Sequence, residues 1–273
     1  MNPRIAKALV NGLLLGGAAV ALFPLLWMLS VSFMRPGETG SLPPPLLPAH
    51  ATFDNYRELF LRAGMGQYLL NSLLVSSAIT LLSLACNLMA GYAFAKLRFA
   101  GRRVLFQILI GGLVIPAQVA MLPLFLLLKY LGLIDSYAGV IVPAMATVFG
   151  IYLVRQYARS IPDELLEAAR IDGAGEWRIF VQIVLPLLKP IMVTLAIFTF
   201  LAAWNDFMWP LIVLTGQEHY TLPIGLASLA REHAQDSELM MAGSVVTVLP
   251  VLLLFLALQR YYLQGLLLGS VKG

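Results

Sequence analysis

Residues 155–190 read RQYARSIPDELLEAARIDGAGEWRIFVQIVLPLLKP and form the longest charged interruption in an otherwise apolar chain. Of the 273 residues, 60% are hydrophobic and only 12% are charged. An ordinary soluble domain has about a quarter of its residues charged. The composition therefore indicates a membrane protein, and the charged stretch is predicted to be a loop between membrane-spanning segments.

Six apolar runs around this loop are long enough to cross a bilayer, which takes about 20 residues in a helix. They cover residues 8–34, 68–94, 104–128, 137–154, 190–214 and 240–262. The first run exceeds the apolar core of a signal peptide, so we expect it to remain as a span. The sequence predicts an all-α, polytopic membrane protein with one transmembrane domain over residues 1–273, six transmembrane helices and a polar loop over 155–189.

The distribution of basic residues predicts the orientation, because loops rich in Lys and Arg stay in the cytoplasm. With both termini inside, 13 of the 18 Lys and Arg residues lie in cytoplasmic segments and 5 lie outside. The loop over 155–189 is then cytoplasmic. The same residues are scattered in short clusters and form no basic stripe, which argues against a nucleic-acid partner.

A short helix is predicted inside the loop. Ser160 is a residue type that caps helices, Pro162 suits a first turn, and the acidic Asp163 and Glu164 suit the positive end of the helix dipole. Gly173 is expected to end the helix in the left-handed conformation. Small side chains recur on one face. An acid-rich, small-faced helix favours docking on another protein, while the alternative is a helix lying on lipid headgroups.

The loop also carries a longer pattern. Seven residues match, without a gap, the EAA motif of ABC importer permeases: Glu167, Ala168, Ala169, Gly173, Ile183, Leu185 and Pro186. Other stretches, including TFDNYRELF, AGYAFAKLRFAGR and IPAQVAMLPLFLLLKYLGLIDS, resemble the carbohydrate branch of that family. The resemblance covers almost the whole chain. It implies a type I ABC importer permease fold and a permease subunit that moves a sugar, a di- or oligosaccharide, into the cell.

The resemblance also implies site residues and partners. The coupling helix that docks on the ATPase would comprise Glu167, Ala168, Ala169, Arg170, Asp172 and Gly173, and Lys272 and Gly273 of the tail would add a C-terminal contact. The implied partners are a second homologous permease, two ATP-binding subunits, an extracytoplasmic solute-binding protein and the lipid bilayer. ATP and Mg²⁺ would bind the ATPase subunits, with no cofactor on this chain, in the inner membrane of a bacterial or archaeal cell.

Motifs for catalysis are lacking in the sequence. A P-loop needs Gly followed by Lys, and none of the five lysines follows a glycine. No Ser/His/Asp or paired-carboxylate arrangement falls at membrane depth, and the single Cys86 has no partner for an internal disulfide. We expect no enzyme activity and no metal site: His219 and His233 are fourteen residues apart, and a solvated loop is the better interpretation.

A substrate pathway is predicted near the outer part of the fifth span. Asp206 is the only one of the 14 acidic residues inside a predicted span, and a carboxylate there is expected to face a cavity or a partner. Trp204, Asn205 and Asp206, with Asn71 of the second span, are candidate pathway residues, because aromatic, amide and carboxylate groups suit sugars. Alternatively, Trp204 belongs to the aromatic belt and Asp206 pairs with another helix.

Two other classes of protein remain to be weighed. An ion-coupled secondary transporter also has kinked spans, but it should carry several ionisable groups at the midplane. A membrane-embedded enzyme should carry a catalytic constellation. Within the ABC family, a glycerol phosphate derivative is an alternative substrate that no residue of the sequence excludes.

Overall fold

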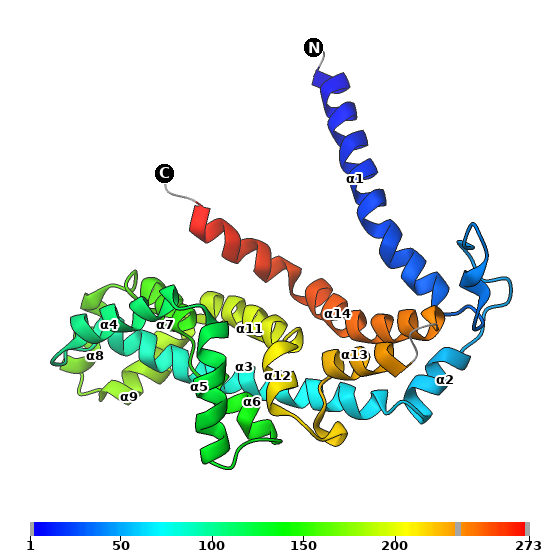
Figure 1. Cartoon of the computed structure of the whole chain (residues 1–273). Coiled ribbons are helices and arrows are strands. Elements are labelled where there is room, and N and C mark those ends of the chain that lie inside the picture. Colours follow the sequence, from blue (N-terminus) through cyan, green and yellow to red (C-terminus); the bar gives the residue numbers. More distant parts are fainter. Residues whose placement is uncertain (1–2, 233–235, 271–273) are drawn as a thin grey trace. The chain divides into compact units, whose positions relative to one another are not determined.

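A computed structural model describes residues 3–232 and 236–270 of the chain. All regular elements within these ranges are helices, which confirms the all-α prediction (Figure 1). The chain divides into two compact units. Unit 1 comprises Met1–Leu69 and Leu222–Leu252, and unit 2 comprises Leu70–Thr221 and Leu253–Gly273.

Unit 1 is built from segments of the chain that are far apart in sequence. Its helices are α1 (Pro3–Val31), η1 (Glu38–Gly40), α2 (Asp54–Leu61), α13 (Leu222–Glu232) and the first part of α14 (Ser237–Ser270). The buried carboxylate of Glu238 accepts hydrogen bonds from the backbone amide and the hydroxyl of Thr39, both at 2.8 Å. These bonds hold the first long loop to the start of α14.

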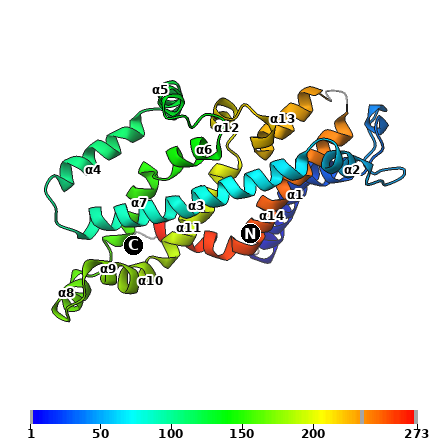
Figure 2. The ribbon, with the colours of Figure 1, turned by 90° about the horizontal axis from the view of Figure 1, so that it is seen from below.

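Unit 2 contains most of the remaining helices. They are α3 (Met65–Lys96, which begins in unit 1), α4 (Arg102–Gly111), η2 (Gly112–Val114), α5 (Ala117–Tyr130), α6 (Tyr137–Ala144), α7 (Val148–Ala158), α8 (Asp163–Ile171), α9 (Glu176–Ile179), the π-helical turn η3 (Phe180–Val184), α10 (Leu185–Leu187), α11 (Lys189–Trp204), α12 (Met208–Val213) and η4 (Gln217–His219). In Figures 1 and 2, α8 and α9 lie beside the C-terminal end of α3, the end that is followed by α4.

A buried polar contact joins α3 to the start of α7. Asn87 of α3 accepts a hydrogen bond from the backbone amide of Thr147 at 3.0 Å, and its own amide donates to Ser83 Oγ at 2.8 Å. Thr147 in turn caps α7 by accepting from the amide of Gly150. Because water is absent from the bilayer core, polar groups at this depth need such internal partners.

Membrane-spanning segments can be assigned by length and composition. Among the described residues, four helical segments are long and apolar enough to cross a membrane: Leu9–Val31, Met65–Lys96, Tyr137–Ala158 and Ser237–Ala257. Two bent helix pairs, Arg102–Val114 with Ala117–Tyr130 and Glu176–Leu187 with Lys189–Trp204, bring the number to as many as six.

The predicted third and fifth spans are not single straight helices. In the third, the axis turns by 106° between η2 and α5, where Ile115 and Pro116 are extended. Proline disfavours helical backbone in the residue before it, which explains the break. In the fifth, α11 ends at Trp204 and α12 resumes only at Met208. Asp206 therefore lies in a break between two helices.

Candidate functional site

The helix α8 occupies the centre of the loop, as the sequence predicts, but it begins differently. Its N-cap is Pro162, and the hydroxyl of Ser160 donates to the carbonyl of Tyr157 instead of capping α8. The prediction that Ser160 caps this helix was therefore wrong, because the hydroxyl satisfies the end of the preceding helix.

Gly173 ends α8 as predicted. Its φ is +81°, in the left-handed region that favours glycine. The amide of Gly173 donates to the carbonyl of Arg170, and the amide of Ala174 donates to the carbonyl of Ala169, both at 3.0 Å. This pair of bonds is the Schellman motif, which satisfies the last carbonyls of the helix. The turn therefore fixes the direction in which the chain leaves α8.

One side of α8 is buried and the other is open. Ile161 and Leu166 are 5% and 1% exposed and belong to a cluster of buried side chains from α3, α7 and the segment from α9 to α11. Five of the six predicted coupling residues are exposed and Ala169 is partly buried: Glu167, Ala168, Ala169, Arg170, Asp172 and Gly173. The structure thus brings them together on a small helix whose back is anchored.

Apolar side chains extend this open surface. Ile171, at the end of α8, is 86% exposed, and Trp177 of α9 is 68% exposed. Leu165 is 42% exposed. Large apolar groups gathered beside small polar ones are typical of protein–protein contact surfaces.

Two groups of polar contacts attach α8 to the end of α3. The Lys96 ammonium lies 2.5 Å from the carbonyl oxygen of Ile161 and 2.6 Å from Oδ1 of Asp163. This hydrogen bond and the positive charge of Lys96 lower the pKa of Asp163 below its ordinary value. At the other end of α8, Tyr92 donates to Oε2 of Glu176 at 3.0 Å, while Oε1 of Glu176 accepts from Nε of Arg170 at 2.7 Å.

Sequence reasoning missed Tyr92, Lys96 and Glu176. Tyr92 and Lys96 are four residues apart and so share one face of α3, close to the charged end of the predicted span. That spacing was a usable signal. Their partners lie 65 to 84 residues further along the chain, and no local pattern pairs such distant groups.

A cavity of about 680 Å³ lies within unit 2. Its walls are mainly apolar side chains of α5, α6 and α11, with Ile79 contributed by α3. Three polar side chains reach it: Thr147, Thr199 and Asp206. Asp206 also accepts a 3.4 Å hydrogen bond from the amide of Trp209, in the first turn of α12. The carboxylate is thus placed by the break between α11 and α12.

The other predicted pathway residues do not line this cavity. Trp204 is 1% exposed and stacks on Phe200, with ring centroids 5.7 Å apart. The amide of Asn205 donates to the carbonyl of Leu201 at 2.8 Å and finishes α11. Of the four predicted pathway residues, the structure therefore brings Asp206 to the cavity.

Asn71 closes a loop instead. Its amide nitrogen donates to the carbonyls of Glu218 and Tyr220 at 2.8 and 2.9 Å, and its oxygen accepts from the hydroxyl of Tyr137 at 2.8 Å. Its side chain is 3% exposed. These bonds tie the start of the second predicted span to the loop after α12.

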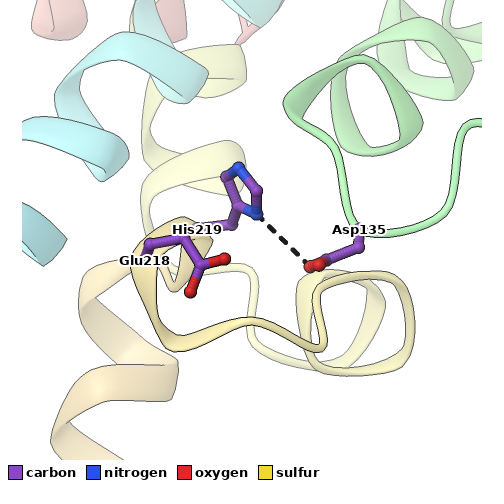
Figure 3. A group of neighbouring side chains, drawn as sticks. All are labelled: Asp135, Glu218 and His219. Carbon is purple, nitrogen blue, oxygen red and sulfur yellow. Dashed lines mark hydrogen bonds and ion pairs between the residues drawn. The ribbon is translucent and has the colours of Figure 1, made fainter.

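Asp135 holds the same loop from the other side. Its Oδ1 accepts from the amides of Thr215 and Gly216 at 2.8 and 2.9 Å and lies 3.3 Å from Nδ1 of His219 (Figure 3). The two amide bonds lower the pKa of Asp135 below its ordinary value. The sequence analysis did not single out Asp135.

Glu218 completes a cluster with Asp135 and His219. Ligand atoms of the three side chains lie within 4.8 Å of one another, and Figure 3 shows them facing a common space. The hydrogen bonds of Asp135 explain its position as a loop closure. His233, the other predicted member of this loop, lies outside the described residues, as do Lys272 and Gly273 of the predicted C-terminal contact.

Comparisons with known proteins agree with this architecture. A family model described as "Binding-protein-dependent transport system inner membrane component" matches residues 87–267. The chain is 41% identical over 263 residues to the arabinooligosaccharides transport system permease protein AraQ of Halalkalibacterium halodurans, covering 94% of this chain and 93% of the relative. It is 37% identical over 263 residues to the diacetylchitobiose uptake system permease protein NgcG of Streptomyces coelicolor, covering 95% and 87%.

A solved structure shares the fold. It is a chain of a bacterial ABC transporter involved in the import of the acidic polysaccharide alginate, and it is 26% identical to this chain. The two superpose with a TM-score of 0.85 over 96% of this chain and 98% of that chain. The likeness therefore extends over nearly the whole chain.

Proposed function

This chain belongs to the family of binding-protein-dependent transport system inner membrane components, and from that premise we propose that it is the permease subunit of an ABC importer for a di- or oligosaccharide. Two relatives with high identity are named for arabinooligosaccharides and diacetylchitobiose. Another relative, 32% identical, is named for sn-glycerol 3-phosphate, so a small phosphorylated solute is the second candidate substrate.

The observation that carries the proposal is the exposed face of α8. Glu167 and Ala168 are exposed on a helix whose opposite side is buried. The exposed Asp172 follows the last residue of that helix, and Gly173 fixes the turn after it. Small side chains allow a helix to sit deeply in a groove, and Ile171 supplies apolar contact area beside them. We assign this face to docking on an ATPase subunit, with the tail residues Lys272 and Gly273 as a second contact.

The remaining partners follow from this assignment. A second, homologous permease would complete the transport pathway, and one ATPase subunit would dock on the coupling helix of each permease. ATP and Mg²⁺ would bind those ATPase subunits, and this chain would perform no hydrolysis itself. Both termini would be cytoplasmic, because that orientation keeps 13 of the 18 basic residues inside.

The cavity beside Asp206 is the proposed part of the pathway. Apolar and aromatic walls suit the apolar faces of sugar rings, and a carboxylate accepts hydrogen bonds from hydroxyls. Thr147 and Thr199 add hydroxyl groups to the same walls. An ion-driven transporter is less well supported, because Asp206 is the one acidic side chain at this cavity among the described residues.

Photocrosslinking tests the docking face. In a Cys86→Ala background, Ala168→Cys is labelled with a benzophenone maleimide, and the assembled complex is irradiated. We expect a covalent product with the ATPase subunit. Leu126→Cys, at a 56% exposed position of α5, is the matched control and should give none. A product with lipid alone at position 168 would contradict the assignment.

The substrate is tested on the complete complex. Proteoliposomes with the solute-binding protein outside are offered a probe mixture of isotopically labelled arabinotriose, diacetylchitobiose and lactose. We expect ATP-dependent uptake of one of these sugars. Uptake of labelled glycerol 3-phosphate, with none of the three sugars taken up, would favour the second candidate.

A further inference from the structure

We propose that Tyr92 and Lys96 are positioning residues that fasten both ends of α8 to α3, so that α3 and the coupling helix move as one body. The inference rests on the proposed function of α8 as the ATPase-docking helix. It goes further by naming the membrane helix that receives the displacement of α8 and the side chains that transmit it.

The first attachment is at the start of α8. The side chain of Lys96 is 6% exposed, although Asp163 beside it is 73% exposed. A buried ammonium needs partners, because taking an unpaired charge out of water is costly. Lys96 finds two: the carbonyl oxygen of Ile161 and Oδ1 of Asp163, one residue on either side of the N-cap of α8. The ammonium therefore binds both the backbone of Ile161 and the side chain of Asp163.

The second attachment is at the end of α8. Tyr92 is 4% exposed, and its hydroxyl donates to Glu176. The other oxygen of Glu176 accepts from Arg170, which lies in the last turn of α8. The ring of Tyr92 also packs on Phe180, with centroids 5.3 Å apart. A relay of three side chains thus connects α3, α9 and α8.

Two attachments restrain α8 in a way that one does not. A single contact would leave the helix free to pivot, whereas contacts at both ends of its nine residues, about 13 Å apart, oppose rotation as well as separation. The side chains of Leu166 in α8 and of Ile161, just before α8, are buried in the cluster that also contains Leu88 and Tyr92 of α3. A displacement of α8 by a partner bound to its open face would therefore move α3 as well.

The same helix reaches the proposed pathway. Ile79 of α3 lines the cavity, and Asn87 of α3 holds the backbone of Thr147, whose side chain also lines it. Movement of α3 thus reaches the cavity wall directly and through the start of α7. This continuous set of contacts gives the coupling loop a physical connection to the pathway.

The first test removes the attachments with little change of volume. Tyr92→Phe keeps the ring and loses only the hydroxyl, and Lys96→Met keeps the length and loses the charge. In proteoliposomes with the probe mixture, we expect the double variant to retain its ATPase subunits and its ATP hydrolysis. Sugar transported per ATP should fall at least about tenfold, the size expected for losing even one of the three hydrogen bonds to charged groups that the double variant removes. Unchanged transport per ATP would refute the inference.

A matched control separates coupling from general stability. Arg62, the residue that follows α2, forms an ion pair at 3.0 Å with Glu58 of α2, in unit 1 and at the surface. Arg62→Met removes a charge of the same sign and should leave transport per ATP unchanged. An equal fall in both variants would show that the readout reports stability, and would count against the inference.

The second test restores the attachment covalently. In the Cys86→Ala background, Lys96→Cys with Asp163→Cys breaks the first attachment, and a short bifunctional thiol reagent then links α3 to α8. We expect the unlinked pair to couple poorly and the linked pair to recover transport per ATP. A linked protein that hydrolyses ATP without transport would mean that α3 and α8 must separate during the cycle, which contradicts the inference.

The proposed function fails in a different way from this inference. If the unmodified complex shows no ATP-dependent uptake, or if position 168 does not crosslink to the ATPase subunit, the docking assignment is wrong. If both succeed and the two tests above give the contrary results, the docking assignment stands and the fastening of α8 to α3 does not.

Discussion

Gly91 of α3 leaves no room for a side chain beside Val154 of α7. A Cβ on Gly91 would lie 2.5 Å from Cγ1 of Val154 and 3.0 Å from the backbone nitrogen of Arg155. Real Cβ atoms essentially never approach another atom at the first of these distances. The side chain of Val154 therefore packs directly against the backbone of α3 at Gly91. Val154 is fully buried there and belongs to the cluster that anchors α8.

Gly91→Ala is therefore expected to destabilise the protein by about 1–3 kcal/mol, the usual cost of overpacking. Thermal unfolding of the purified complex in detergent measures it. Val154→Ala in the same chain should recover part of the loss, because it removes the methyl groups that clash. Gly111→Ala is the matched control, since a Cβ there meets nothing within 4 Å. Equal effects at both glycines would contradict the packing account.

Asn87→Leu is expected to cost about 1–3 kcal/mol, because it leaves the backbone amide of Thr147 without its buried acceptor. Unfolding in detergent again gives the comparison. Gln156→Leu on α7 is the control: its amide contacts only exposed side chains, those of Tyr152 and Arg159. The account predicts little change there. A stable Asn87→Leu protein would show that the amide has another partner.

Gly173→Ala should weaken docking of the ATPase subunit. A residue with a Cβ is strained by about 1–2 kcal/mol in the left-handed conformation, and the Schellman turn at the end of α8 should rearrange. Gly175→Ala is a close control, since Gly175 has a φ of −71° and space around it. The measurement is the amount of ATPase subunit retained on affinity-purified permease, with loss expected only for Gly173→Ala.

The loop held by Asp135 should loosen in acid. The pKa of Asp135 is lower in the folded protein than its ordinary value of 3.8, because the carboxylate accepts the amides of Thr215 and Gly216. A lowered folded pKa means that the stabilisation is fully present above the ordinary pKa and is lost as pH falls through the folded one. Proteolysis of the loop after α12 should therefore be unchanged from pH 7 to about 5 and rise below about 4.

Asp135→Asn gives the contrast for that prediction. Asparagine also tolerates the left-handed backbone of this position, whose φ is +57°. Because the amide does not titrate, cleavage should already be faster at pH 7 and should lose its rise in acid. A variant with the same acid profile as the unmodified protein would assign the rise to another group.

The membrane helices were predictable because length and apolar composition alone select them. The bends were not, since a hydropathy average over twenty residues carries no information on direction. Pro116 was the local signal for the first bend, through its effect on Ile115. The break between α11 and α12, which exposes Asp206 to the cavity, has no comparable signal from a proline. The only indication in the sequence was the carboxylate of Asp206 itself, because an ionised group is costly in lipid.

The site also contains residues that were predictable from local sequence and residues that were not. Gly173 could be placed because the left-handed turn depends on its own backbone, and the helix before it followed from local periodicity. Lys96 and Tyr92 could not be paired with Ile161, Asp163 and Glu176, because those contacts exist only after the chain has folded back. Asn71 illustrates the converse: a buried amide at membrane depth suggested a pathway, and folding uses it to close a loop.

The central claim is that transport through this chain is driven by ATP through the face of α8. The most direct measurement compares uptake of the probe mixture into proteoliposomes that enclose ATP and Mg²⁺ with uptake into proteoliposomes that carry only a proton or sodium gradient. The account predicts uptake with ATP alone, lost on Glu167→Arg. Uptake driven by the gradient without ATP, or undiminished ATP-driven uptake in Glu167→Arg, would contradict it.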